Sequence, residues 1–155
     1  MKQDQRKYVA KNKKATFDYF VLSTYEAGIV LYGTEIKSIR NGNANLKDSY
    51  CEFKDGELYV RGMHISPYEK GNIFNRDPLR LKKLLMHKRE LMTLFGKVKQ
   101  DGLTLIPLSL YFSGAKVKVE LGLCRGKKNY DKRETLAKKE ATREMEKRLK
   151  ANNAY

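Results

Sequence analysis

Alternation of apolar and polar residues is the strongest pattern in this chain, and it predicts short β-strands. Its clearest example is the run 116–123, whose apolar positions are Val117, Val119, Leu121 and Leu123. Successive side chains of a strand point to opposite faces, so these four residues would share the inner face of a sheet. The positions between them are two lysines, a glutamate and a glycine. The run therefore predicts a strand with an apolar inner face and a basic outer stripe.

A hairpin is predicted at Asp55-Gly56, which separates two further alternating runs, 49–54 and 57–61. Asp-Gly between such runs is typical of a two-residue β-turn. Another strand is expected at residues 103–112. Pro107 interrupts that run, and because proline cannot donate to a ladder it marks either an edge strand or a bulge.

Earlier in the chain, residues 18–23 and 29–32 are strand-like and rich in aromatic and β-branched side chains. The stretch between them predicts a second hairpin, with Glu26 at its tip. A short helix is expected at residues 33–40, with Thr34 as the candidate N-cap.

Residues 80–86 fit either a strand or the start of a helix, because Asp77-Pro78 favours a helix N-terminus. We favour a strand through Leu85. A helix would follow from about Lys88 to Lys99, and Gly102 would close it.

Together these elements predict a mainly β fold: an OB-like antiparallel β-barrel of six to seven strands with two helices. The barrel is expected over residues 12–124. Residues 1–11 are expected to form a flexible basic arm, and residues 125–155 a basic, helix-capable C-terminal tail.

Charge points to the class of partner. The chain has 33 Lys and Arg against 18 Asp and Glu, a net charge of +15. Residues 125–150 hold 11 basic and 5 acidic side chains, and the apolar seam of this segment is too thin to hold a helix onto a core. The tail is therefore expected to be disordered when free and to become helical on a polyanion, most simply RNA.

Candidate chemistry is sparse, and we interpret the protein as a binder without enzyme activity, cofactor or metal. No phosphate-binding glycine loop is present, and neither His64 nor His87 has metal-ligand spacing to a second ligand. Cys51 and Cys124 are expected to be free thiols of a cytoplasmic protein. No apolar run reaches membrane-spanning length. A structural ribosomal protein and an RNA-processing enzyme remain as alternatives.

Several motifs taken together resemble one known family. They are Tyr25-Glu26-Ala27-Gly28, Gly33-Thr34-Glu35-Ile36-Lys37-Ser38, Asn45-Leu46-Lys47-Asp48-Ser49-Tyr50, Lys83-Leu84-Leu85-Met86-His87-Lys88-Arg89-Glu90 and Gly126-Lys127-Lys128-Asn129-Tyr130-Asp131-Lys132-Arg133. In order and spacing they are similar to the SsrA-binding protein, or small protein B, family. The match runs from about Asn12 to Glu134.

The resemblance implies a monomeric RNA-binding factor that carries transfer-messenger RNA, through its tRNA-like domain, to stalled 70S ribosomes for trans-translation. It implies an RNA face of Asn12, Lys13, Tyr19, Glu26, Glu35, Lys37, Arg40, Asn45, His87, Lys88, Arg89 and Lys118. It also implies that the tail occupies the empty mRNA channel and the 16S rRNA decoding centre, with contacts from Gly126, Lys127, Lys128, Asp131, Lys132 and Arg133. Two departures stand out: Phe17 replaces a frequent histidine, and the distal tail lacks the tryptophan of some members.

Overall fold

The computed structural model describes residues 6–69 and 75–153. Its strands are β1 (Arg6–Lys11), β2 (Tyr19–Ile29), β3 (Ala44–Asn45), β4 (Tyr50–Lys54), β5 (Glu57–Arg61), β6 (His64–Ile65), β7 (Lys82–Leu85), β8 (Thr104–Ser113) and β9 (Lys116–Gly126). Its helices are α1 (Lys13–Asp18), α2 (Gly33–Arg40), α3 (Lys88–Asp101) and α4 (Asn129–Asn153).

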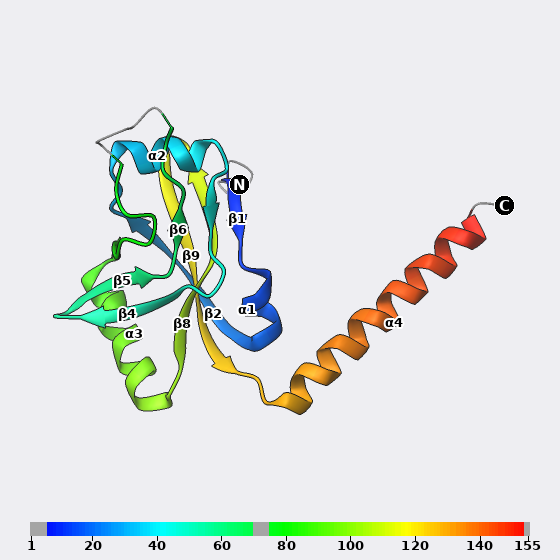
Figure 1. Cartoon of the computed structure of the whole chain (residues 1–155). Coiled ribbons are helices and arrows are strands. Elements are labelled where there is room, and N and C mark those ends of the chain that lie inside the picture. Colours follow the sequence, from blue (N-terminus) through cyan, green and yellow to red (C-terminus); the bar gives the residue numbers. More distant parts are fainter. Residues whose placement is uncertain (1–5, 70–74, 154–155) are drawn as a thin grey trace.

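Seven strands form one antiparallel sheet in the order β1-β8-β9-β2-β7-β5-β4, and β3 pairs with β6 beside it. The sheet curls so that β4 lies against β8, although its edge strands β1 and β4 are not hydrogen-bonded to each other. Figure 1 shows α2 at the top of this body and α3 lower down beside β4 and β5. The mainly β, OB-like prediction is confirmed, with the barrel left unclosed.

The hairpin at Asp55-Gly56 is confirmed. Both turn residues have positive φ, 53° and 77°, as a tight β-hairpin turn requires, and β4 pairs with β5 across them. The strand through Leu85 and the helix from Lys88 are also confirmed as β7 and α3. Gly102 ends α3 in the left-handed conformation, with φ at 63°.

The prediction of a hairpin with Glu26 at its tip is wrong. Residues Tyr19–Ile29 form one continuous strand, because β9 offers a partner along its length, from Tyr19 opposite Gly126 to Gly28 opposite Lys118. Glu26 therefore lies in the middle of the sheet, directly across from Glu120. Local composition suggested a turn, and the long partner strand overrides it.

The prediction of a flexible arm through residue 11 is wrong for Arg6–Lys11, which forms β1 and pairs antiparallel with β8. Aromatic and cationic contacts hold this strand. The Arg6 guanidinium lies 4.6 Å from the centre of the Tyr111 ring, and the Tyr8 ring packs at 5.5 Å from the same ring. Residues 1–5 lie outside the described residues.

The number of helices is corrected, and the two alternatives for Pro107 are resolved. Helix α1 was not predicted, so the described body holds one helix more than expected. The six residues of α1 are too few to show a helical period in the sequence. Pro107 is not on an edge, because β8 lies between β1 and β9; it sits at a register shift, so the bulge alternative holds.

The core fills the inside of the curled sheet. Leu58, Leu84, Leu110, Val119 and Leu121 are completely buried there, and α3 closes one side with Leu94. These are largely the positions that the alternating pattern placed inward. Fully burying such side chains contributes roughly 1.5–3 kcal/mol each, which explains why the sheet can curl around them.

Both cysteines are buried free thiols, as expected. Burial raises the pKa of the Cys124 thiol to about 11, and it also raises that of Cys51. Both therefore stay protonated and unreactive near neutral pH.

Candidate nucleic-acid interface

A polar cluster on the outer face of the sheet fixes Glu26. Its carboxylate accepts a hydrogen bond from the Tyr111 hydroxyl and one from Arg6 at 3.4 Å, while Arg6 also reaches Glu120 at 3.2 Å. Burial raises the pKa of Tyr111 above its ordinary range, so its hydroxyl remains a donor. The Glu26 side chain is still 45% exposed. The Glu26 carboxylate is thus fixed in position and still open to solvent, so it can accept hydrogen bonds from the amino groups of a nucleobase edge.

Lys118 lies one strand away on β9, opposite both Tyr111 and Gly28. It lines a cavity of about 440 Å³ whose other walls include Lys116 and the half-exposed Leu85. A cavity that combines apolar side chains with two lysines is suited to a nucleic-acid backbone that passes over the sheet.

Exposed cations also lie on the helices α2 and α3. Lys37 and Arg40 lie on α2, with Lys37 5.5 Å from the centre of the Tyr68 ring. His87 occupies the N-cap position of α3, and Lys88 and Arg89 follow in its first turn. All of these side chains are exposed. A helix N-terminus with added cations favours phosphate.

The predicted contact residues do not form one compact cluster. In Figure 1, α2 and α3 lie at opposite ends of the body, and strands β2 and β9, which carry Glu26 and Lys118, lie between them. The predicted contact residues are therefore spread along the length of the body. Asn45 is exposed on β3, where its side-chain oxygen accepts from the Lys47 amide at 2.8 Å.

The structure gives Asn12 an internal role in place of the expected direct contact. The residue is 7% exposed, and its side-chain oxygen caps α1 by accepting from the Ala15 amide at 3.2 Å. Its amide nitrogen donates to the carbonyls of Pro107, at 3.0 Å, and Leu46, at 3.3 Å. With these bonds made, the side chain ties α1 to two distant segments, and both of its N–H donors are in use.

Glu35 is likewise internal, although it was expected on the RNA face. It is 5% exposed and forms a two-bond ion pair with Arg80, at 2.7 and 3.2 Å. It also accepts from the Tyr32 amide at 2.8 Å, which caps the start of α2. Burying a carboxylate is costly unless it is paired in this way, so removal of either partner should destabilise this end of the body.

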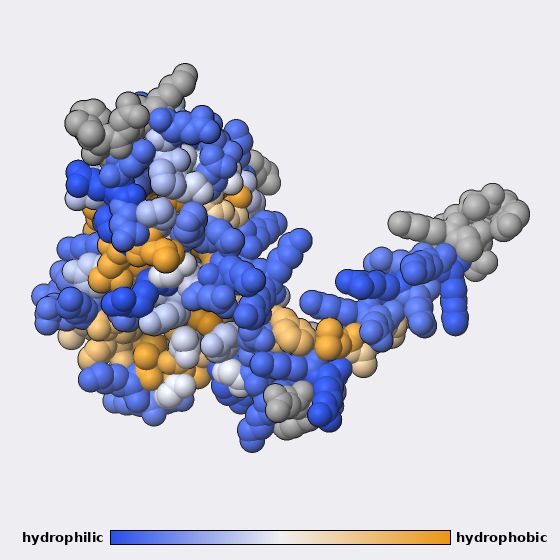
Figure 2. Space-filling view, in the orientation of Figure 1, coloured by the Kyte–Doolittle hydropathy of each residue, from blue (hydrophilic) through white to orange (hydrophobic). Residues whose placement is uncertain are grey.

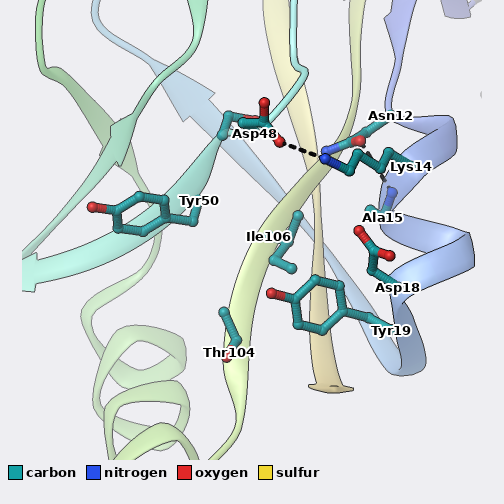
Figure 3. Close-up of a pocket in the computed structure, with 10 residues that line it drawn as sticks. Asn12, Lys14, Ala15, Asp18, Tyr19, Asp48, Tyr50, Thr104 and Ile106 are labelled. Atoms are coloured by element: carbon teal, nitrogen blue, oxygen red, sulfur yellow. Dashed lines mark hydrogen bonds and ion pairs between the residues drawn. The ribbon is translucent and has the colours of Figure 1, made fainter. Parts of the chain in front are cut away.

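A pocket of about 240 Å³ opens between α1 and the sheet, and Figure 3 shows its residues. Tyr19 and Tyr50 reach it from different strands, and Ile106 lies between them. Lys14 pairs with Asp48 at 3.0 Å on its rim. Tyr19 is thus half-buried in the wall of a hollow, while the neighbouring Lys13 is exposed.

The base of the tail is attached to α1. The Lys127 amide donates to the Asp18 carbonyl at 2.9 Å, and its ammonium donates to the Thr16 carbonyl at 3.2 Å. Lys132 pairs with the Asp18 carboxylate at 3.3 Å. Gly126 ends β9 immediately before these contacts. These bonds set where α4 leaves the body.

Beyond its first turns, α4 extends away from the sheet, and its described side chains are exposed (Figure 1). Figure 2 shows hydrophilic side chains along most of it. Lys128 and Arg133 are exposed near its base, whereas the side chain of Asp131 lies outside the described set. The predicted helix is confirmed; its expected disorder in the free protein stays a prediction.

Fold and surface together define a class: a small OB-like β-protein with a basic surface and a projecting cationic helix, features typical of RNA-binding proteins. The described part of the chain contains no helix long and apolar enough to cross a membrane. It also brings together no group of three His, Cys, Asp or Glu residues suited to a metal ion.

A sequence model of the SmpB protein family matches residues 9–151. The chain is 57% identical to the SsrA-binding protein of Acetivibrio thermocellus over 98% of this chain and 99% of that protein. It is 58% identical to that of Clostridium perfringens, over 99% of both chains. A chain in a solved structure described as "tmRNA-SmpB: a journey to the center of the bacterial ribosome" is 54% identical, with a TM-score of 0.64 over 77% of this chain and 84% of that chain. The chain belongs to the SmpB protein family.

Proposed function

We propose that this protein binds the tRNA-like domain of transfer-messenger RNA and delivers it to stalled ribosomes for trans-translation. The observation that carries the proposal is near-full-length identity of 57–58% to relatives named for SsrA binding. The solved relative from a tmRNA-SmpB ribosome structure supports the same partners. The function is binding and delivery in the cytoplasm by a monomer, without catalysis of its own.

The RNA face consists of the exposed members of the predicted set, together with the half-buried Tyr19 and Lys118; the exposed members are Lys13, Glu26, Lys37, Arg40, Asn45, His87, Lys88 and Arg89. Asn12 and Glu35 act from inside by holding α1 and α2. Because several lysines and arginines neutralise phosphates, binding should weaken steeply as salt rises.

The tail serves the ribosomal step. Residues 126–133 contact the decoding centre, and the rest of α4 occupies the empty mRNA channel. Most of α4 is exposed and does not pack against the sheet, and the stability of an isolated helix in water is marginal. The tail is therefore ordered by rRNA, whose phosphates neutralise its lysines and arginines.

Replacing Asp131, Lys132 and Arg133 together with alanine tests this division. The variant should bind the tRNA-like RNA within about twofold of wild type, because the RNA face keeps all its residues and the body loses only the Lys132–Asp18 ion pair. It should nevertheless fail to tag peptides on stalled ribosomes. Filter binding and a tagging assay measure the two steps. Equal loss of RNA binding would contradict the division between body and tail.

Hydrogen exchange on the full-length protein tests tail ordering. Amides of residues 133–150 should exchange rapidly in the free protein and become protected on stalled ribosomes, while those of β9 are protected in both. Strong protection of the tail without ribosomes would refute coupled folding.

A further inference from the structure

Two arginines lie over one exposed tyrosine at the α2 end of the body, and the family motifs include neither the tyrosine nor Arg76. The guanidinium carbon of Arg76 is 4.0 Å from the centre of the Tyr32 ring, and that of Arg80 is 4.8 Å from it. Tyr32 is 45% exposed, and Arg76 is exposed. Two cations therefore share the face of one ring that is open to solvent.

The two arginines differ in what else they bind. Arg80 uses most of its N–H donors: besides its ion pair with Glu35, it donates to the carbonyls of Val30, at 3.3 Å, and Leu81, at 3.2 Å. Arg76 is not. Among residues 6–69 and 75–153, it has no hydrogen-bond or ion-pair partner beyond the Tyr32 ring contact. Its N–H donors are therefore available.

The backbone on both sides of Arg76 is fixed. On one side, Asn75 is clamped to Tyr68: its side-chain oxygen accepts from the Tyr68 amide at 2.9 Å, and its nitrogen donates to the Tyr68 carbonyl at 2.8 Å. On the other, the Arg80 amide donates to the Asp77 carbonyl at 3.0 Å, and the Asp77 carboxylate accepts from the Leu79 amide at 2.9 Å. The carboxylate of Asp77, the acidic neighbour of Arg76, is thus bonded within its own loop.

A second anchor holds the loop from below. Lys82 is completely buried, and its ammonium donates to the carbonyls of Met63 at 2.9 Å, Arg80 at 2.8 Å and Pro78 at 3.4 Å. The Ile65 amide also donates to the Pro78 carbonyl, at 3.1 Å. An exposed arginine is therefore carried on a rigid base.

We propose that Arg76, held over the Tyr32 ring, is a preformed fork for an RNA phosphate. A planar guanidinium presents paired N–H donors that match phosphate oxygens, and stacking fixes its plane before the ligand arrives. Lys37 and Arg40 extend the same basic end along α2, with Lys37 over the ring of the Tyr68 that clamps Asn75. The site deepens, and rests on, the proposed RNA-binding function.

Three variants test the fork. Arg76→Gln removes charge and fork, Arg76→Lys keeps the charge alone, and Tyr32→Leu keeps Arg76 but removes its stacking surface. Lys99→Gln is the matched control, because Lys99 is also exposed and lies 4.8 Å from the centre of an aromatic ring, that of Phe95. Urea unfolding of each variant separates RNA effects from loss of the fold.

RNA affinity is measured across a salt series with two ligands: the tRNA-like domain of transfer-messenger RNA, and small ribosomal subunits. Arg76→Gln should weaken binding to one of them by about fivefold and lower its salt slope by about 0.7–0.9, as expected for one lost phosphate contact. The ligand affected identifies the source of the phosphate. Arg76→Lys should retain the slope with weaker affinity, and Tyr32→Leu should fall between wild type and Arg76→Gln.

An Arg76→Gln effect no larger than that of Lys99→Gln on both RNAs would overturn the inference. The outcome is separable from failure of the proposed function. If the wild type did not bind the tRNA-like RNA while Arg76→Gln still weakened subunit binding, the proposed function would fail and the fork would stand.

Discussion

The burial of Asn12 leads to a prediction that separates an internal role from RNA contact. Asn12→Ala deletes one helix cap and two side-chain donors, which leaves the carbonyls of Leu46 and Pro107 without these partners in a buried region. The cap is worth about 1 kcal/mol and each lost hydrogen bond roughly 1 kcal/mol more. The free energy of unfolding should therefore fall by about 3 kcal/mol, which is a large part of the roughly 5–15 kcal/mol typical of a domain.

Urea unfolding followed by circular dichroism measures this change, with Asn45→Ala as the matched control. Asn45 is exposed and makes one local side-chain bond, so its loss should cost less than about 1 kcal/mol. Asn12→Asp divides the contributions: it keeps the cap acceptor but turns a carboxylate toward two carbonyls. That variant should be at least as unstable as Asn12→Ala at neutral pH and recover stability as acid protonates it.

The refuting result is specific. If Asn12→Ala unfolded within about 0.5 kcal/mol of wild type yet bound RNA much more weakly, Asn12 would be a contact residue and its internal bonds would be unimportant. A stability loss with RNA binding reduced only in proportion to the unfolded fraction supports the internal role.

Two further predictions concern the core and its buried lysine. Burial lowers the pKa of Lys82 from 10.5 to about 8, so between these values the unfolded chain binds more protons at this residue. The stability of wild type relative to Lys82→Met, measured as urea midpoints, should therefore rise with pH from about 8 to 10. The reference variant is needed because the raised pKa values of Cys51, Cys124 and Tyr111 act in the opposite direction in both proteins above about pH 9. A Cβ on Gly122 would lie 2.8 Å from Leu108, so Gly122→Ala should lower the free energy of unfolding by about 1–3 kcal/mol. A Cβ on Gly96 of α3 meets nothing within 4 Å, so Gly96→Ala should raise it by about 0.5–1 kcal/mol. Equal effects of the two variants in thermal melts would contradict the packing argument.

Where local chemistry decides structure, the sequence was sufficient. Asp55-Gly56 selects its hairpin because its turn requires positive φ at both residues, and Gly102 ends α3 for a similar reason. The alternation over 116–123 correctly placed its four apolar residues inside β9. The conjunction of motifs also led to the SmpB family.

The candidate site was harder to predict than the fold, because the resemblance of motifs indicates which residues are important without indicating whether they contact RNA or stabilise the protein. Asn12 and Glu35 were expected to contact RNA, and both turned out to be buried in hydrogen-bond networks. Arg76 was missed because its significance comes from Tyr32, 44 positions away, and no local pattern joins them. The Asp18 contacts to the tail could have been suspected from charge, but not assigned.

By itself, the sequence determined the strand pattern, the turns, the excess of positive charge and the family. Only the tertiary structure decided that Arg6–Lys11 is a strand, that β2 runs unbroken through Glu26, and which polar side chains face inward. The physical reason is distance along the chain. Asn12 bonds to a carbonyl 95 residues away and Glu35 pairs with an arginine 45 residues away, and such partners meet only when the sheet has curled around its core.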